Sequence, residues 1–225
     1  MLQCIVAKLK ISYNAPVVLT FAIIATLVHG LSHLFGFWWQ SWFIAWPEFH
    51  GTRTYVGLVS HIFGHGDWNH LLSNFTMILL IGPILEERHG SRSLLAMIGI
   101  TALITGLINV TFFSHPLLGA SGIVFMMILL ASTVNFERGT IPLTFIAVVI
   151  LFLGNEVLSM FGKSDGISHS AHLIGGAAGA AFGFLTAGKR PVSPGKSALP
   201  VVAAKPGLPA KIPTASPRGN LPPLG

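Results

Sequence analysis

Residues 171–183 read Ala171-His172-Leu173-Ile174-Gly175-Gly176-Ala177-Ala178-Gly179-Ala180-Ala181-Phe182-Gly183, an apolar segment that carries one histidine. Small residues recur at every fourth position, at 171, 175, 179 and 183. This spacing puts them on one face of a helix, where they let a neighbouring helix approach closely. The segment is therefore predicted to be a closely packed membrane helix, with His172 one position from its packing face.

The composition of the whole chain indicates an integral membrane protein. Apolar residues make up 52% of it and charged residues 9%, with a mean hydropathy of +0.73, whereas a soluble domain carries about a quarter charged residues. A helix needs about 20 apolar residues to cross a bilayer core of about 30 Å. Six stretches qualify, at about residues 15–37, 68–85, 93–113, 119–134, 141–161 and 169–187. We therefore predict an all-α membrane domain of six transmembrane helices over residues 15–187.

Positive charge is distributed unevenly around these six segments. Eleven of the 13 Lys and Arg residues flank one side, and Arg53 and Lys163 flank the other. The positive-inside rule then predicts that both termini are cytoplasmic, which agrees with an even number of spans. This topology, with attraction to anionic membrane lipid, accounts for the sequence pI of about 9.9. A nucleic-acid partner is not indicated, because no soluble surface of interleaved basic and aromatic residues is visible.

The two ends of the chain differ from the apolar region between them. Residues 1–14 are predicted to be a cytoplasmic N-terminus. Residues 188–225 hold nine of the 14 prolines and show no apolar period, so this tail is predicted to be a disordered cytoplasmic extension. The single cysteine, Cys4, excludes an intrachain disulfide and leaves too few thiols for a zinc cage.

Polar side chains inside membrane segments are costly and are therefore candidates for function. In the stretch His65-Gly66-Asp67-Trp68-Asn69-His70-Leu71-Leu72-Ser73-Asn74, Asp67 is predicted to cap the helix that follows. His70 and Asn74 are four residues apart and share one helix face. They can direct an imidazole and an amide toward one point.

Ser121 is a hydroxyl framed by small residues in Gly119-Ala120-Ser121-Gly122, where a loop passes into the fourth segment. Gly119 and Gly122 leave the hydroxyl unshielded, and free amides at a helix N-terminus can face developing negative charge. Taken alone, such a serine can also be interpreted as structural, with its hydroxyl donating a hydrogen bond to a carbonyl one turn back. The small-residue face of the sixth segment would bring His172 within reach of Ser121, as a base beside a nucleophile.

Three of these patterns together resemble the rhomboid intramembrane serine proteases. They are His65-x4-His70-x3-Asn74, Gly119-Ala120-Ser121-Gly122 and Ala171-His172-x2-Gly175-x3-Gly179, in order on the second, fourth and sixth segments. The stretch Glu86-Glu87-Arg88-His89-Gly90-Ser91 is also similar to the family's Glu-x-Arg-x-Gly-Ser turn. The resemblance covers about residues 15–187 and implies a six-helix rhomboid-like bundle in a bacterial inner membrane.

The resemblance implies a Ser-His dyad that cleaves transmembrane segments of other membrane proteins near the non-cytoplasmic face. Ser121 would be the nucleophile and His172 the base, and the oxyanion would be met by the Ser121 amide with the side chains of His70 and Asn74. Expected substrates have helix-weakening residues and a small residue at the cut. The resemblance implies no metal or other cofactor and leaves the oligomeric state open.

The resemblance also implies supporting roles. Glu86 and Arg88 would brace the structure, and Phe125 replaces a tyrosine that in the family often stacks on the catalytic imidazole, so that stacking should persist. The supporting residues are His65, Glu86, Arg88, Gly119, Gly122, Phe125, Gly175 and Gly179.

The first loop departs from the family pattern, because the positions of its frequent Trp-Arg pair hold Val56 and Gly57, and Arg53 is displaced by four residues. The aromatic stretch 38–55 is still predicted to be an interfacial amphipathic element.

Other ionisable residues are given lesser roles. Asp165, seven residues before His172 in a loop, is expected to be solvated rather than the third member of a triad. Glu156 is expected to face a water-accessible cavity, and His29 and His33 are expected to be structural.

Three alternatives stay open. A catalytically silent relative that binds membrane proteins would usually lack the serine or the histidine, and a proton-coupled transporter would not require Ser121 between glycines. A histidine-rich metal carrier is disfavoured because no carboxylate or thiol joins the histidines at ligand spacing.

Overall fold

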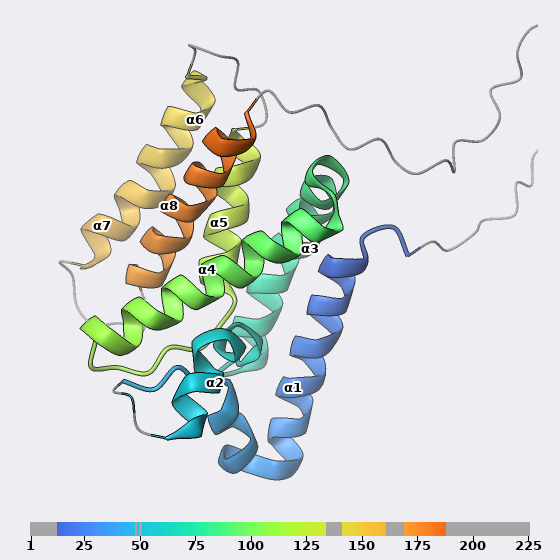
Figure 1. Cartoon of the computed structure of the whole chain (residues 1–225), viewed down its shortest axis with the longest axis vertical. Helices are drawn as coiled ribbons and strands as arrows, with labels where there is room; N and C mark the ends of the chain where they lie inside the picture. Colours follow the sequence, from blue (N-terminus) through green and yellow to red (C-terminus); the bar gives the residue numbers. More distant parts are fainter. Residues whose placement is uncertain (1–12, 48, 50, 134–140, 161–168, 188–225) are drawn as a thin grey trace, which may run out of the picture. The chain divides into compact units, whose positions relative to one another are not determined.

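A computed structural model describes residues 13–47, 49, 51–133, 141–160 and 169–187 (Figure 1). All of these fall in the first of two units into which the chain divides, Met1–Ser193, and the second unit is Pro194–Gly225. The predicted tail at 188–225, most of residues 1–14, and Asp165 lie outside the described residues, so their assignments stay predictions.

The described residues are helical apart from turns, loops and one isolated β-bridge. The all-α membrane fold predicted from the sequence is confirmed, and each of the six predicted segments contains a helix. The short helix α2 in the first loop was not predicted. The elements are α1 (Pro16–Gln40), η1 (Ser41–Phe43), α2 (Thr52–Ser60), η2 (His61–Phe63), α3 (Trp68–His89), α4 (Ser91–Phe112), α5 (Ser121–Ser132), α6 (Leu143–Val148), the π-helical segment η3 (Val149–Leu153), α7 (Gly154–Met160) and α8 (His169–Thr186).

Not every predicted span is long enough to cross a bilayer alone. In the described part of the chain, three stretches have the length and composition to span a membrane: Pro16–Phe43, α3 and α4. Helix α5 and residues 143–158 are apolar but shorter. With 12 residues, α5 is about 18 Å long. The number of spans therefore stays a prediction.

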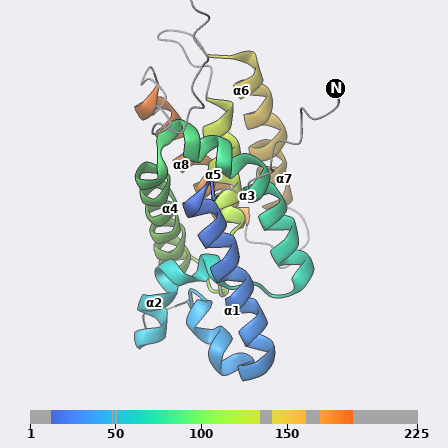
Figure 2. The same cartoon turned by 90° about the vertical axis from the view of Figure 1, so that its right-hand side faces the viewer.

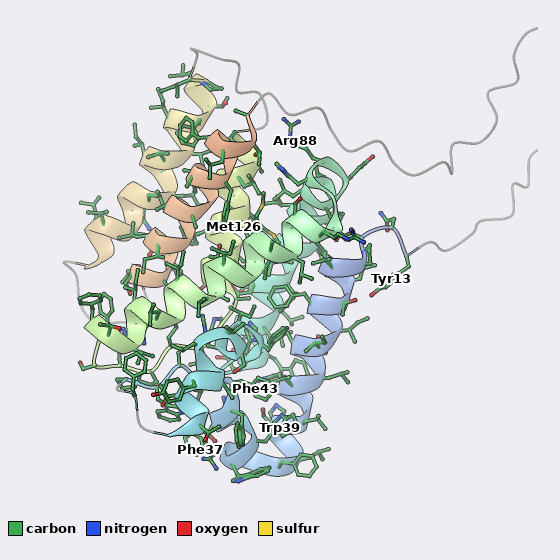
Figure 3. All side chains as sticks on the ribbon, in the orientation of Figure 1. Tyr13, Phe37, Trp39, Phe43, Arg88 and Met126 are labelled. Atoms are coloured by element: carbon green, nitrogen blue, oxygen red, sulfur yellow. The ribbon has the colours of Figure 1, made fainter. Side chains whose placement is uncertain are left out.

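Helix α5 is the central helix of the described bundle. It packs against α8, α3, α4 and α6, and it lies between its neighbours in both views (Figure 1, Figure 2). Met126, labelled near the middle of Figure 3, is fully buried. A short apolar helix is stable in this position because other helices, rather than lipid, surround it.

The small-residue face of α8 packs directly on α5, as the sequence predicted. A Cβ at Gly175 would overlap the backbone of Gly122, and a Cβ at Gly179 would overlap the backbone of Met126. The order of these contacts shows that the two helices run parallel. Their N-terminal ends, which carry Ser121 and His172, are therefore neighbours.

Glu86 anchors the N-terminus of α1 from a distant point of the sequence. Its Oε1 accepts a hydrogen bond from the amide of Val17 and its Oε2 one from Val18, both at 3.0 Å. The residue before α1, Ala15, offers no polar side chain for these amides. A buried carboxylate here makes charge-assisted hydrogen bonds and complements the helix dipole. Glu86 thus braces α1 against α3.

Glu86→Ala is expected to destabilise the fold by about 2–4 kcal/mol, because two charge-assisted hydrogen bonds are lost and two amides at a helix end are left unpaired. For a chain of this size, the unfolding midpoint in detergent should fall by about 5 °C or more. Glu87→Ala is the matched control, since Glu87 is exposed on the next position of α3. Equal midpoints for the two variants would contradict the bracing role.

Candidate active site

The start of α3 is fixed by Asp67, as predicted. Its Oδ1 accepts a hydrogen bond from the backbone N–H of His70 at 2.9 Å. This hydrogen bond also holds the pKa of Asp67 below its ordinary value. Because the cap sets the first turn of α3, it sets the direction of His70 and of Asn74 one turn later.

Gly119 brings the loop before α5 against these two side chains. Its φ of +122° is unfavourable for residues that have a Cβ. A Cβ there would lie 2.8 Å from Nε2 of His70 and 3.9 Å from Nδ2 of Asn74. The amide of Gly119 donates to the carbonyl of His61 at 2.9 Å. The turn that delivers Ser121 is therefore held in contact with α3, and glycine is required at this position.

A cavity of about 450 Å³ lies where these elements meet. Its lining includes His70, Asn74, His115, Ser121 and His172. Exposed residues on its rim, such as Gly66 and Pro116, open it to the surface. The candidate nucleophile, the candidate base and both candidate oxyanion donors thus face one water-accessible space.

The amide of Asn74 is an unusual feature of this cavity. The side chain is buried, with 6% exposure, and its Nδ2 has no hydrogen-bond partner among the described residues. Buried polar groups are nearly always paired, so an unpaired donor facing a cavity is typical of a group that binds something during function.

Backbone pairing between two loops holds Leu117, one of the residues that line the cavity, in place. Ala45 and Leu117 exchange hydrogen bonds of 2.9 and 3.0 Å in an antiparallel β-bridge. The Nδ2 of Asn109 donates to the carbonyl of His115 at 2.9 Å. These contacts tie the first loop and α4 to the segment just before Ser121.

His172 is held between a ring and a carboxylate. The ring of Phe125 stacks on it with centroids 4.4 Å apart and planes 7° from parallel, so the stacking expected at this position is present. In addition, Nδ1 of His172 lies 3.0 Å from Oε2 of Glu156. The same oxygen lies 2.6 Å from Nδ1 of His169. The imidazole therefore presents Nε2 away from Glu156.

The expectation that Glu156 faces a water-accessible cavity is wrong. Glu156 is buried, with 8% exposure, and contacts two histidines of α8. We also inferred from the sequence that no carboxylate lies at ligand spacing from the histidines. None lies at that spacing along the sequence, but in the folded chain Glu156 lies beside His169 and His172. A signal was present in the sequence, since Glu156 is the one charged residue in the predicted span 141–161, and charges at membrane depth are usually functional.

The π-helical segment η3 lies just before Glu156 and helps to explain its position. A π-helical turn contains an extra residue, so each such turn rotates the side chains that follow by about 100° relative to a regular α-helix. Both η3 and α7 pack against α8, and Leu153 of η3 contacts Gly176 of α8. The register after η3 turns Glu156 toward α8.

Three histidines near the start of α3 are buried: His29, His61 and His65. The carbonyl of His65 accepts a hydrogen bond from Nδ1 of His29 at 3.2 Å, and its ring packs edge-on against His70 with centroids 5.0 Å apart. Nδ1 of His61 donates to the carbonyl of Gly57 at 3.0 Å. The structural role expected for His29 and His65 agrees with these contacts. His33 is exposed and stacks on Trp68.

The structure should lose stability as the pH falls below about 6.5. Burial lowers the pKa of both His61 and His65 to about 4, whereas an unfolded histidine titrates near 6.5. Between these values the unfolded chain binds more protons, so stability is fully present above 6.5 and is lost progressively toward pH 4, by up to about 1.4 kcal/mol per pH unit for each group.

Thermal unfolding of the Ser121→Ala protein from pH 7.5 to 4.5 tests this. His61→Gln should flatten the dependence, and His115→Gln, at an exposed position, should not. A midpoint that is constant below pH 6.5 would contradict neutral burial of these residues.

The first loop forms a Trp–Arg contact at positions other than those of the family. The guanidinium of Arg53 lies over the ring of Trp42, 5.4 Å from its centroid, which joins the start of α2 to η1. Gly57 is instead used for close approach, because a Cβ there would overlap the backbone of Ile44. Trp38 and Tyr55 are exposed, in keeping with an interfacial aromatic element.

Arg88 lies near Glu86 at the C-terminal end of α3 (Figure 3). This end is about 30 Å along the helix from Asp67, so neither Glu86 nor Arg88 reaches the cavity, and the supporting role expected of Arg88 stays a prediction.

Comparison with known proteins identifies the family. The family model of the Rhomboid domain matches residues 52–189, which is more than half of the chain and runs from α2 to the end of α8. None of the curated proteins compared with the chain matches it. On the strength of the domain match and the apolar helices, this chain is an integral membrane protein that belongs to the rhomboid family.

Proposed function

We propose that this chain is an intramembrane serine endopeptidase with Ser121 as nucleophile and His172 as base. One observation carries the proposal: Ser121 and His172, on neighbouring parallel helices, line the same cavity as Asn74, whose Nδ2 has no hydrogen-bond partner among the described residues. A rhomboid relative that only binds membrane proteins would not require this combination of groups.

The reaction is proposed to proceed through an acyl-enzyme. Nε2 of His172 accepts the hydroxyl proton of Ser121 as Oγ attacks the carbonyl carbon of the scissile peptide. The C–N bond then breaks, and the proton passes to the leaving amine. Water entering from the open rim is deprotonated by the same nitrogen and hydrolyses the ester, which returns Ser121 to its free form.

The oxyanion is proposed to be met by three donors. Ser121 is the first residue of α5, so its amide is one of the free amides at the helix N-terminus. The side chains of His70 and Asn74 reach the same space from α3. Donors fixed in advance stabilise developing charge strongly in a water-poor site.

Glu156 is proposed as a positioning residue behind His172, which adds a carboxylate to the Ser-His dyad. Its contact with Nδ1 favours the tautomer that carries the proton on Nδ1, in which Nε2 carries the lone pair that a base needs. It also stabilises the imidazolium that forms during attack.

Glu156→Gln should lower kcat about tenfold to a thousandfold with little change in KM, because the base loses its orientation while substrate binding is untouched. The assay is run with a chelator present. Glu87→Gln is the control for removing a carboxylate elsewhere. An effect on KM alone, or on the unfolding midpoint alone, would contradict the positioning role.

The proposed orientation places the cavity near the non-cytoplasmic face. The start of α3, the start of α5 and the first turn of α8 all meet at the cavity, and the positive-inside rule puts this end away from the cytoplasm. We take the location to be a bacterial inner membrane with both termini cytoplasmic. The partners are then membrane lipid and transmembrane substrates with helix-weakening residues.

The function is tested on purified protein with a fluorophosphonate probe and a test transmembrane substrate. The wild type should be labelled and should cleave, and Ser121→Ala should do neither. Ser132→Ala, at the opposite end of α5, is the matched control and should retain both. Labelling that persists in Ser121→Ala would exclude the proposed nucleophile, and substrate binding without labelling or cleavage would identify a silent relative.

A further inference from the structure

We propose that Glu156, His169 and His172 form a binding site for a transition-metal dication such as Zn²⁺, and that the bound ion prevents His172 from acting as a base. The second half of this proposal rests on the proposed protease function. The first half stands without it.

The three side chains are already arranged as metal ligands. One ligand atom from each of Glu156, His169 and His172 lies within 4.8 Å of the other two. The Nδ1 atoms of both histidines contact Oε2 of Glu156, at 2.6 and 3.0 Å. Ligand bonds to zinc are about 2.0–2.2 Å long, so atoms this close can bind one ion after small side-chain movements. Glu156 and His172 are buried and His169 is largely buried, which shields the site from competing solvent.

The proposed proteolytic reaction does not explain the position of His169. The proposed reaction uses Glu156 and His172, yet His169, three residues earlier on α8, makes the shorter contact with the same carboxylate oxygen. The planes of the two imidazoles are 89° apart, so they approach the oxygen from different directions. Two imidazoles spaced i, i+3 on one helix with a carboxylate from a facing helix form a donor set suited to zinc, with a fourth position left for water.

Metal binding and base catalysis require different tautomers of the His172 imidazole. A metal on Nδ1 of His172 uses the lone pair of that nitrogen, and the neutral ring then carries its proton on Nε2. An Nε2 that carries a proton cannot accept the proton of Ser121. The ion therefore inhibits by fixing the wrong tautomer, without contact with Ser121 or the substrate. Mg²⁺ and Ca²⁺ should not inhibit, because they prefer oxygen ligands.

Binding is tested directly on the Ser121→Ala protein, purified without a histidine tag and stripped with chelator. Co²⁺ should bind with one equivalent and give the visible d–d absorption of a low-coordinate site, and Zn²⁺ should displace it. His169→Asn in this background should weaken binding about tenfold or more. His33→Asn, which changes an exposed histidine of α1, should not. The absence of a saturable Co²⁺ spectrum, or equal affinity in the two variants, would overturn the site.

Inhibition is tested on the active protein. The cleavage rate of each variant is expressed relative to the rate of the same variant without metal. Micromolar Zn²⁺ should inhibit cleavage, chelator should restore it, and His169→Asn should need about tenfold more Zn²⁺. Equal zinc sensitivity in His169→Asn and His33→Asn would overturn the inhibitory role. If no variant cleaves substrate while Co²⁺ binding still depends on His169, the protease proposal fails and the metal site stands.

Discussion

His172→Ala is expected to lower kcat for cleavage of a transmembrane substrate by roughly 10⁴-fold or more. Without Nε2, no group in the proposed mechanism accepts the hydroxyl proton of Ser121. The stacked Phe125 and the carboxylate of Glu156 then have no catalytic imidazole to orient. The measurement is single-turnover cleavage in detergent or liposomes, together with the rate of fluorophosphonate labelling of Ser121.

His115→Ala is the matched control, because His115 lines the same cavity but is exposed. Its hydrogen bond from Asn109 uses the backbone carbonyl, which the substitution preserves. The control should retain most of the activity. If the two variants lost activity equally, or if His172→Ala were still labelled at the wild-type rate, His172 would not be the base.

Asn74→Ala is expected to lower kcat by about a hundredfold or more, the usual effect of removing one oxyanion donor, with KM nearly unchanged. The structure also predicts how this substitution affects stability. Because Nδ2 of Asn74 has no partner among the described residues, its removal breaks no hydrogen bond that this group makes in the fold, and the unfolding midpoint should change little. Steady-state cleavage kinetics and thermal unfolding measure the two effects on one preparation.

Asn69→Ala removes an amide from an exposed position five residues earlier and should leave kcat near that of the wild type. A large fall in the unfolding midpoint of Asn74→Ala, with kcat unchanged, would assign Asn74 a structural role instead.

The sequence predicted the features that depend on local patterns. Apolar composition indicated an all-α membrane fold, Asp67 indicated a helix start, and the spacing of Gly175 and Gly179 indicated the helix face that packs on α5. Ser121 and His172 could be proposed from the sequence because short motifs carry them. Each of these signals lies within a few residues of chain, where helix period and capping chemistry act directly.

The features that the sequence did not predict depend on contacts between distant segments. Glu156 reaches α8 because a π-helical segment sets its register and because α7 packs there, and neither follows from local periodicity. Arg53 meets Trp42 across a loop whose path is fixed by backbone contacts of Gly57. Helix α5 is short because its neighbours shield it, and a count of apolar residues cannot detect that shielding.

The contact of Gly122 with Gly175 limits the route by which a polypeptide can reach the serine. Backbone touches backbone there, so the seam between α5 and α8 leaves no gap wide enough for a side chain, still less for a second chain. In the proposed reaction the substrate therefore does not enter through this seam, whereas the exposed rim at Gly66 and Pro116 leaves a route to Ser121 open.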